Sequence, residues 1–408
     1  MSSSSPLSGL VVIEIGQSIA APYAGMILGE LGAEVIKVEN PRTGDAARGW
    51  GPPFAAGAAT CFHAVNRAKR GIAIDLAEPR AVTELRTLIV GRADVLIHNL
   101  KFGALDRCGL GAAALLAEKP GLVYCNLGAF GATGPLRERP GYDPLMQAHG
   151  GLMSLMGEDG RPPVRVAVSI VDLATGMWSV IGILAALAER RRTGRGGVVD
   201  TSLYEAALAW MTIPIAAHLV NGEIPARQGS GVDMIVPYQA FSAADGAIMV
   251  AAGNDNLYRR LCTAIARPEL AIDPRFRSNK DRVVNRHVLV PILEQIFATE
   301  PIAVWTARLD ATGIPNGPMQ SVDRVVADAQ TVALGMIQHL AVAATEPPLS
   351  LVGLPLSFDG VRPPFVKSAP ALAEDNAAII DRGQCEDNAA IIDRGQCEDN
   401  AAIIDRGQ

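Results

Sequence analysis

The sequence lacks the features that mark secreted, metal-binding or polyanion-binding proteins. Only 6 of its 408 residues are Cys, and none of them has the CxxC spacing of a zinc site. We therefore expect free thiols, as in a cytoplasmic protein, and no metal centre. The formal net charge is -6, so no basic bias favours nucleic acid or an anionic membrane as a partner.

Segments for export or membrane insertion are also not evident. Residues 1–6 contain neither the basic region nor the apolar region of a signal peptide. Polar residues and Pro interrupt the apolar runs, and we expect no run long enough to cross a membrane. What remains is an ordinary globular composition, with 49% hydrophobic and 19% charged residues, in a chain long enough for two domains. We predict a cytoplasmic protein without membrane association.

The first forty residues predict an α/β fold. A buried-type strand (10–15), a small-residue helix (20–31) and a second strand (34–39) follow one another with tight turns. This order begins a Rossmann-like sheet. The turn after the first strand has Gly16 but lacks the other glycines of GxGxxG, which disfavours a dinucleotide site. Three further strands are expected, at 71–76, 93–98 and 122–127.

The later part of the chain predicts a second domain and a return. We assign 1–220 to the first part of the large Rossmann-like domain, ending in one helix (201–220) kinked near Pro214. A smaller α/β domain follows at 228–325, with a hairpin at Asp245-Gly246 and helices at 257–266, 289–298 and 301–311. Strand-rich residues 333–384 should rejoin the large domain.

The last residues repeat. EDNAAIIDRGQ occupies 374–384 and recurs twice in the tail, 385–408. A 12-residue period turns the apolar patch by about 120° per copy on a helix of 3.6 residues per turn, so the copies do not form a solenoid. We expect the duplicated tail to be dispensable.

Asp172 is the candidate centre of the chemistry. A β-type run (164–170) precedes it, and a helix with an apolar face through Leu187 follows, ending at Gly194. Asp172 should therefore lie at a helix N-terminus, where backbone amides and the helix dipole favour its ionised form. Two interpretations are open: an N-cap, for which Asp is a preferred residue, or a carboxylate nucleophile held at a buried helix end.

Three motifs in matching order resemble the class III CoA-transferases. They are Gly141-Tyr142-Asp143, DLATG at 172–176 and TGRG at 193–196, and the likeness extends from about residue 7 to about residue 370. This family includes formyl-CoA transferase, carnitine CoA-transferase and α-methylacyl-CoA racemase. Within it, 235–241 and 313–318 most resemble the succinate/glutarate type. The resemblance implies an intertwined homodimer that takes acyl-CoA and small carboxylic acids, dicarboxylic ones in particular, as substrates, without metal or a tightly bound cofactor.

The resemblance also implies roles for individual residues. Asp172 would be the nucleophile, forming a covalent aspartyl-CoA thioester, and a glycine-rich loop would cover the site. The basic segment 66–70 would belong to the wall around the CoA nucleotide, or else be a solvated surface cluster. The formate- and oxalate-specific member has Gln in place of Ile19 and Arg in place of Asn40, so its acid specificity does not carry over. The expected CoA contacts are Ile19, Ala20, Asn99, Leu100, Lys101, Arg107, Tyr142 and Asp143, and the loop residues are Gly229, Ser230 and Gly231.

Two other functions remain open at this stage. Racemases of the family carry His-Asp in place of Tyr142-Asp143 and a Glu near the position of Asn254, because they must move an α-proton. A tyrosine with a pKa of about 10 is a poor base near neutral pH, so an isomerase is the weaker alternative. A non-catalytic acyl-CoA-binding protein is the other alternative, against which Asp172 argues.

Overall fold

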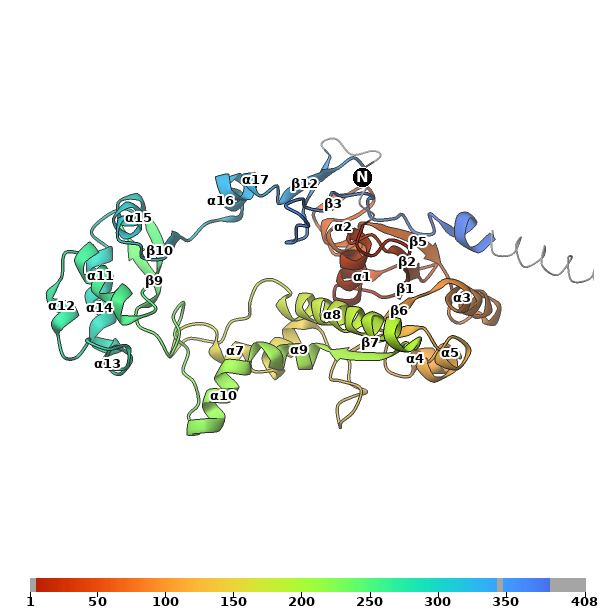
Figure 1. Ribbon diagram of the computed structural model, residues 1–408, viewed down its shortest axis with the longest axis horizontal. Coiled ribbons are helices and arrows are strands. Elements are labelled where there is room, and N and C mark those ends of the chain that lie inside the picture. Colours follow the sequence, from red (N-terminus) through yellow and green to blue (C-terminus); the bar gives the residue numbers. More distant parts are fainter. Residues whose placement is uncertain (1–4, 343–347, 382–408) are drawn as a thin grey trace, which may run out of the picture. The chain divides into compact units, whose positions relative to one another are not determined.

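The computed structural model describes residues 5–342 and 348–381 (Figure 1). Contacts group the chain into two units. The large unit combines Met1–Met146, Val168–Ala209 and Gln330–Gln408, and the small unit combines Gln147–Ala167 with Trp210–Ala329. Residues 147–167, which lie inside the expected first domain of 1–220, thus group with the small unit. Each unit is described separately below.

A six-stranded parallel sheet forms the centre of the large unit. Its strand order is β5-β2-β1-β6-β7-β8, the order of doubly wound α/β sheets, with the topological switch between β1 and β6. The five strands expected in this region are confirmed within three residues at each end, and β8 was not expected. The bounds are β1 Val11–Ile15, β2 Glu34–Glu39, β5 Lys69–Ala73, β6 Val95–His98, β7 Val123–Gly128 and β8 Gly197–Ser202.

Helices cover both faces of this sheet (Figure 1). On one face, α3 (Pro79–Arg92), α4 (Ala104–Arg107) and α5 (Ala112–Glu118) pack on alternate, apolar strand residues such as Ile13 and Leu96. On the other face lie α1 (Ala20–Glu30) and α8 (Ile170–Thr193), which pack along each other.

The two helices α1 and α8 approach closely at Gly176. A Cβ atom at Gly176 would lie 2.8 Å from the Ala20 carbonyl oxygen and 3.0 Å from the Tyr23 ring. Glycine therefore permits the contact that holds the first turns of both helices side by side. Asp172 lies one turn before this contact.

Helix α8 differs from its expectation at its start. No strand occupies 164–170: the helix already begins at Ile170, so Asp172 is its third residue, whereas the end at Gly194, with φ of 72°, is confirmed. By length and composition, α8 is long and apolar enough to cross a membrane, and three candidate spans exist in the described residues if two bent helix pairs each count as one. The expectation of no such run was wrong because Asp172 is the only charge between 170 and 188. The absence of membrane association stays a prediction.

The expected single helix at 201–220 is two helices. Helix α9 (Leu203–Trp210) follows β8 directly, and α10 (Thr212–Asn221) is bent by 65° relative to it. The break lies at Met211 rather than at Pro214, because Pro214 is within the first turn of α10, where a missing amide hydrogen removes no helix bond.

The small unit contains an antiparallel sheet of three strands with helices packed on it. The expected hairpin at Asp245-Gly246 and the three expected helices are confirmed. Its core centres on a ring cluster of Phe241, Phe297 and Trp305. The bounds are β9 Tyr238–Ala243, β10 Gly246–Ala251, β11 Asn316–Pro318, α11 Asp255–Ala264, α12 Glu269–Ile272, α13 Asn279–Val284, α14 Arg286–Phe297 and α15 Ile302–Ala311.

After the small unit, the chain contacts the β5 edge of the large sheet. Asp375 accepts from the Gly71 amide at 2.9 Å and pairs with Arg70, while Asn376 accepts from the Ala73 amide at 2.8 Å. The tail 385–408 lies outside the described residues. The remaining elements are β3 Phe54–Ala55, β4 Ala58–Ala59, β12 Ile337–Leu340, β13 Leu349–Val352, the 3-10 helix Ala46–Gly49, α2 Thr60–Asn66, α6 Asp143–His149, α7 Leu152–Leu155, α16 Val322–Ala327, α17 Ala329–Ala333 and a π-helical turn Ala377–Asp381.

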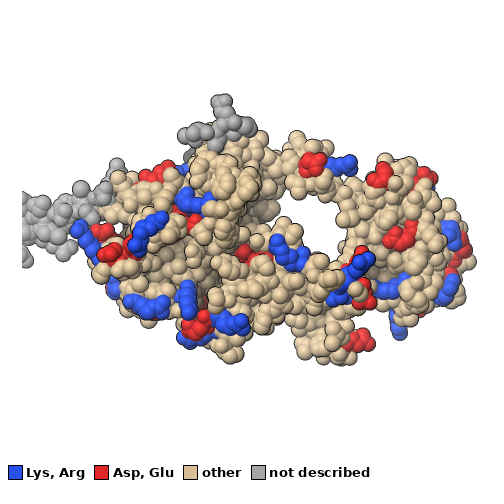
Figure 2. Space-filling view, turned by 180° about the vertical axis from the view of Figure 1, so that it is seen from behind, with Lys and Arg blue, Asp and Glu red and all other residues tan. Residues whose placement is uncertain are grey.

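Charges of both signs are mixed on one face of the molecule. On the face shown in Figure 2, basic and acidic side chains are interspersed, and exposed pairs such as Arg92 with Glu34 and Arg192 with Glu189 are in contact. A polyanion is bound by a surface on which cations are gathered, so this face favours no such partner. The absence of nucleic-acid binding remains a prediction.

Candidate active site

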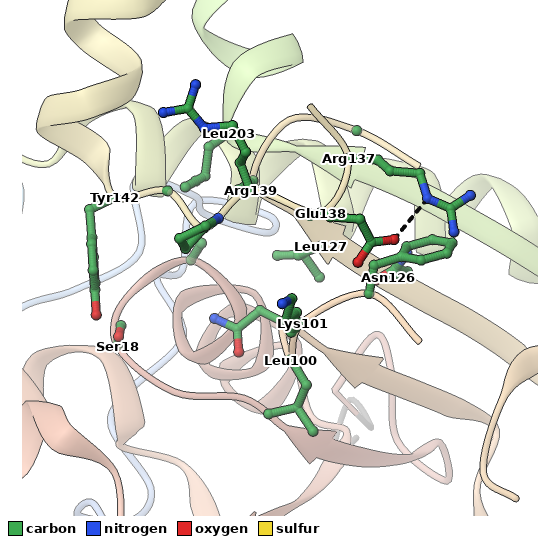
Figure 3. Close-up of a pocket in the computed structure, with 18 of the residues that line it drawn as sticks. Ser18, Leu100, Lys101, Asn126, Leu127, Arg137, Glu138, Arg139, Tyr142 and Leu203 are labelled. Carbon is green, nitrogen blue, oxygen red and sulfur yellow. Dashed lines mark hydrogen bonds and ion pairs between the residues drawn. The ribbon is translucent and has the colours of Figure 1, made fainter. Parts of the chain in front are cut away.

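A cavity of about 260 Å³ opens at the carboxyl ends of β1, β6 and β7 (Figure 3). This is the topological switch point of the sheet, the place where doubly wound folds bind ligands. Asp172 contributes to its wall from the first turn of α8. The other lining residues are Gln17, Ser18, Ala20, Asn99, Leu100, Lys101, Phe102, Asn126, Leu127, Gly128, Ala129, Gly131, Arg137, Glu138, Arg139, Pro140, Gly141, Tyr142 and Leu203.

Asp143, and not Asp172, caps helix α8. The Oδ2 atom of the buried Asp143 carboxylate accepts from the Val171 amide at 2.7 Å and from the Asp172 amide at 3.2 Å. The residue at the N-cap position is Ser169, whose side chain makes no cap bond among the described residues. The N-cap interpretation of Asp172 was therefore wrong, because a second aspartate from another segment already satisfies these amides.

The expected ionised form of Asp172 is not favoured either. Burial, and secondarily the neighbouring Asp143 carboxylate, raise the pKa of Asp172 to about 7. Burial penalises the charged form, and a like charge nearby adds to the penalty. The helix dipole, on which the sequence expectation depended, is weaker than these two effects because Asp143 already neutralises the helix end.

Of the predicted CoA contacts, five line the cavity and three do not. Ala20, Leu100, Lys101 and the exposed Tyr142 line the cavity, as does Asn99. The Asn99 side chain is engaged with the protein itself: its Oδ1 accepts from the Gln17 amide at 3.0 Å, and its Nδ2 donates to the Gln17 carbonyl at 2.8 Å.

Three predicted contacts do not line this cavity. Ile19 is the N-cap residue of α1 and Arg107 ends α4, while Asp143 lies buried behind the wall. The predicted loop residues Gly229, Ser230 and Gly231 belong to the small unit, where Ser230 Oγ accepts from the Ala240 amide at 3.0 Å. A role of this loop at the active site stays a prediction.

Several lining residues were missed by the sequence reasoning. Gln17 and Asn126 lie at the ends of β1 and β7, and the rule that parallel sheets bind ligands at their carboxyl ends could have identified them. Arg137 and Arg139 follow in the loop after β7 (Figure 3). Arg137 pairs with Glu138 at 3.0 Å and lies over the Phe102 ring. With Lys101, these arginines make the cavity's rim basic.

A second cavity of about 420 Å³ lies at the carboxyl ends of β1, β2 and β5. Gln17 and Leu100 belong to the walls of both cavities. Arg42, which pairs with Asp75 at 3.2 Å, contributes a cation to the second one.

The basic segment 66–70 lines neither of these cavities, and it is not solvated. Arg67 pairs with the buried Glu30, Lys69 pairs with the buried Glu14 at 2.6 Å, and Arg70 reaches the edge residue Asp375. The expectation of a solvated surface cluster was wrong, because carboxylates on neighbouring elements bind each of these cations. A place of this segment in the wall around the CoA nucleotide stays a prediction. Within residues 5–342 and 348–381, no group of three or more His, Cys, Asp or Glu side chains could hold a metal ion.

Comparisons with known proteins give one consistent result. Residues 7–376 match CoA-transferase family III. The chain is 39% identical to the succinyl-CoA:glutarate CoA-transferase of Mus musculus, covering 82% of this chain and 77% of that protein, and 36% identical to the succinate–glutarate CoA-transferase of Agrobacterium fabrum, covering 92% and 95%. A solved CAIB/BAIF family protein from Brucella suis superposes with a TM-score of 0.81 at 39% identity, covering 92% and 98%. The chain belongs to CoA-transferase family III and transfers CoA between acyl-CoA and carboxylic acids.

Proposed function

We propose that Asp172 is the nucleophile and that the transfer passes through an aspartyl-CoA thioester. The observation that carries this proposal is a carboxylate with a raised pKa, facing the switch-point cavity from the first turn of a buried helix. A carboxylate with a higher pKa is a more basic and therefore better nucleophile once ionised. Asp172 is the acidic residue of this wall that lies on a helix fixed by packing, whereas Glu138 lies on an exposed loop.

The covalent sequence needs no net proton transfer. The Asp172 carboxylate attacks the thioester carbonyl, the C–S bond breaks, and CoA leaves as thiolate with a mixed anhydride remaining. The thiolate then attacks the aspartyl carbonyl, and the donor acid leaves as carboxylate. An acceptor carboxylate attacks the resulting aspartyl-CoA thioester, releasing the thiolate once more. The thiolate attacks the acceptor's carbonyl in the new anhydride, which forms the product thioester and regenerates Asp172.

The start of α1 can stabilise the oxyanions of this sequence. Helix α1 begins at Ala20 in the cavity wall, and in the described part of the chain no side chain caps it. First-turn amides of a helix favour negative charge. The corresponding Val171 and Asp172 amides of α8 already donate to Asp143, so α1 is the better source of donors.

The two cavities suit the two ends of a CoA thioester. We propose that the second cavity takes the nucleotide and that the first takes the pantetheine and thioester. The rim cations Lys101, Arg137 and Arg139 of the first cavity would then pair with the pyrophosphate, where the nucleotide joins the pantetheine, as guanidinium and ammonium groups do. Each of these side chains is exposed at the rim, so its contribution should weaken as the ionic strength rises.

We propose dicarboxylic acids of the succinate or glutarate type as the favoured acids. The support is the activity for which the two relatives above, at 36–39% identity, are named. The test is a panel of mono- and dicarboxylates offered with succinyl-CoA. We expect kcat/KM to be highest for four- and five-carbon dicarboxylates. A monocarboxylate preferred by a wide margin would reject this specificity without rejecting CoA transfer.

An isomerase remains a weaker alternative. A racemase needs a proton acceptor, and the candidate positions do not offer one. Tyr142 is 60% exposed on the cavity wall. Asn254 is the N-cap of α11, where its side chain accepts from the Leu257 amide at 2.9 Å. We expect no exchange of the α-proton of a 2-methylacyl-CoA in deuterium oxide; exchange at the rate of transfer would favour the isomerase.

We also propose that the active form is an intertwined cytoplasmic homodimer. Its support in the large unit is an apolar stripe along α8 that is exposed in the single chain. Met177, Trp178 and Ile181 are 40%, 50% and 53% exposed, although one neighbouring face of the same helix is buried. Large apolar surfaces of this kind mark protein interfaces.

A further inference from the structure

The short segment 16–18 contributes residues to the walls of both cavities. Gly16 and Gln17 line the second cavity, and Gln17 and Ser18 line the first. We call this segment the saddle. It connects β1 to α1, and its Ser18 has a φ of 69°, in the left-handed region that non-glycine residues avoid. Such a conformation persists only where the surroundings impose it.

Three side chains from separate elements bind the saddle's backbone. Lys37 donates from Nζ to the Gly16 carbonyl at 2.8 Å, and Asp45 accepts through Oδ1 from the Ser18 amide at 2.9 Å. Asn99 binds both the amide and the carbonyl of Gln17. The backbone groups that would otherwise be free to turn toward a ligand are thus fixed.

Two of these three side chains, Lys37 and Asp45, belong to a buried ionic cluster under α1. Lys37 bridges Glu14 at 3.1 Å and Asp45 at 2.9 Å, and all three side chains have no solvent exposure. Glu14 and Lys37 are directly paired across β1 and β2, which places both on the face covered by α1. Lys69 completes the cluster on Glu14 at 2.6 Å. The charges of the two cations, Lys37 and Lys69, therefore balance those of the two anions, Glu14 and Asp45.

Charge pairing explains why this cluster is stable although its side chains are fully buried. Burial alone lowers the pKa of Lys37, but Glu14, Asp45 and Glu39 outweigh burial and hold the pKa above its usual value. Burial raises the pKa of Asp45, yet Lys37 and the amides of Ser18 and Ala47 outweigh it and the pKa is lowered. Hydrogen bonds between charged partners fix the orientation of the two side chains more tightly than hydrogen bonds between neutral groups do.

We infer that Lys37 and Asp45 are positioning residues for the acyl-CoA: through the saddle, this buried pair sets the shape of the wall against which both halves of CoA bind. The inference rests on the proposed binding of CoA across the two cavities. Hydrophobic side chains could have filled the same space with less desolvation cost, but they could not have bound a carbonyl and an amide of the saddle. We therefore assign to Lys37 and Asp45 a role in shaping the binding site, and not only a role in stabilising the fold.

The test compares substitutions at Asp45 with a matched buried ion pair elsewhere. Asp45→Ala removes the acceptor for the Ser18 amide, whereas Asp45→Asn keeps an acceptor oxygen and removes the charge. Glu30→Gln removes the charge of the buried Glu30–Arg67 pair, which does not contact the saddle. A displacement of about 1 Å in a positioning wall costs up to about 100-fold. We expect Asp45→Ala to weaken CoA binding and kcat/KM for acyl-CoA by about 10- to 100-fold.

The two control variants separate positioning from stability. All proteins are assayed well below their melting temperatures, with CoA affinity measured by titration calorimetry. Glu30→Gln should lose stability but keep CoA affinity within about twofold, and Asp45→Asn should recover most of what Asp45→Ala loses, because its oxygen can still accept the amide. If Asp45→Ala does not fold, Asp45→Ser replaces it, since Ser still caps Ala47 but is too short to reach both Ser18 and Lys37.

Each outcome decides a different question. Asp45→Ala with a CoA affinity equal to that of Glu30→Gln would overturn the positioning role alone, leaving the proposed function intact. Wild-type protein that binds no CoA would overturn the proposed use of the cavities, and the positioning role with it. Loss in Asp45→Ala with recovery in Asp45→Asn supports the inference.

Discussion

Replacing Asp172 by Asn should make the protein more stable at high pH. The pKa of Asp172 in the folded protein, about 7, lies above its ordinary value of 3.8. Between these two pH values the folded protein therefore holds a proton that the unfolded chain has lost. Stability therefore falls as the pH rises from about 4 to about 7. The difference of about 3 between the two pKa values lowers the free energy of unfolding by at most about 4 kcal/mol at pH 8 and by about 1.5 kcal/mol at pH 5.

Asn has nearly the shape of Asp and carries no charge, so Asp172→Asn should recover this penalty. With an unfolding entropy of roughly 2.1 cal/mol/K per residue, the upper value corresponds to a rise in Tm of about 5 °C at pH 8. The gain at pH 5 should be less than half as large. Thermal unfolding at both pH values, with the exposed Asp159→Asn as control, measures the difference. A gain in Tm at pH 8 that is equal to or smaller than the gain at pH 5 would refute the assignment of the raised pKa to burial and to repulsion by Asp143.

Three further predictions follow from the same site. The kcat/KM for acyl-CoA should rise with pH to a plateau above about 7, the pKa of Asp172; a profile flat between pH 5 and 8 would contradict its role as an ionised nucleophile. Asp143→Asn should move this rising limb to lower pH, because it removes the like charge but keeps an acceptor for α8; an unchanged limb would show that burial alone sets the pKa. Trp178→Glu should yield monomers in sedimentation velocity at micromolar concentration, whereas Arg192→Glu at the exposed end of α8 should not; an unchanged assembly of Trp178→Glu would place the interface elsewhere.

Periodicity predicted the elements well where strands are buried on both faces and helices have two distinct sides. The strands at 34–39 and 123–128 are of this kind, whereas the hairpin was indicated by its turn residues Asp245-Gly246. It failed at 164–170, where a run of valines suggested a strand although the backbone there pairs with no neighbouring strand. It failed again at β8, because an edge strand of six residues leads into a helix without a break.

At the site, the resemblance located Asp172 and the cavity wall, but not the interactions among side chains. Nothing in the local sequence indicates that Asp143, 29 residues earlier, caps α8 and raises the pKa of Asp172. Likewise, the basic segment 66–70 looked exposed because its carboxylate partners lie on distant strands and helices. Pairing between distant charges is decided by the register of the sheet, which the spacing of residues does not reveal.

The most direct test of the account is to trap the covalent intermediate on Asp172. The protein is incubated with succinyl-CoA in the absence of an acceptor and then treated with hydroxylamine, which converts an aspartyl thioester or anhydride into a hydroxamate. Peptide mass spectrometry should find the hydroxamate at Asp172 in the wild type and no adduct in Asp172→Asn, whose transfer activity should be lost. Transfer at near wild-type rate by a folded Asp172→Asn protein, with deamidation to Asp excluded by mass, would contradict the mechanism.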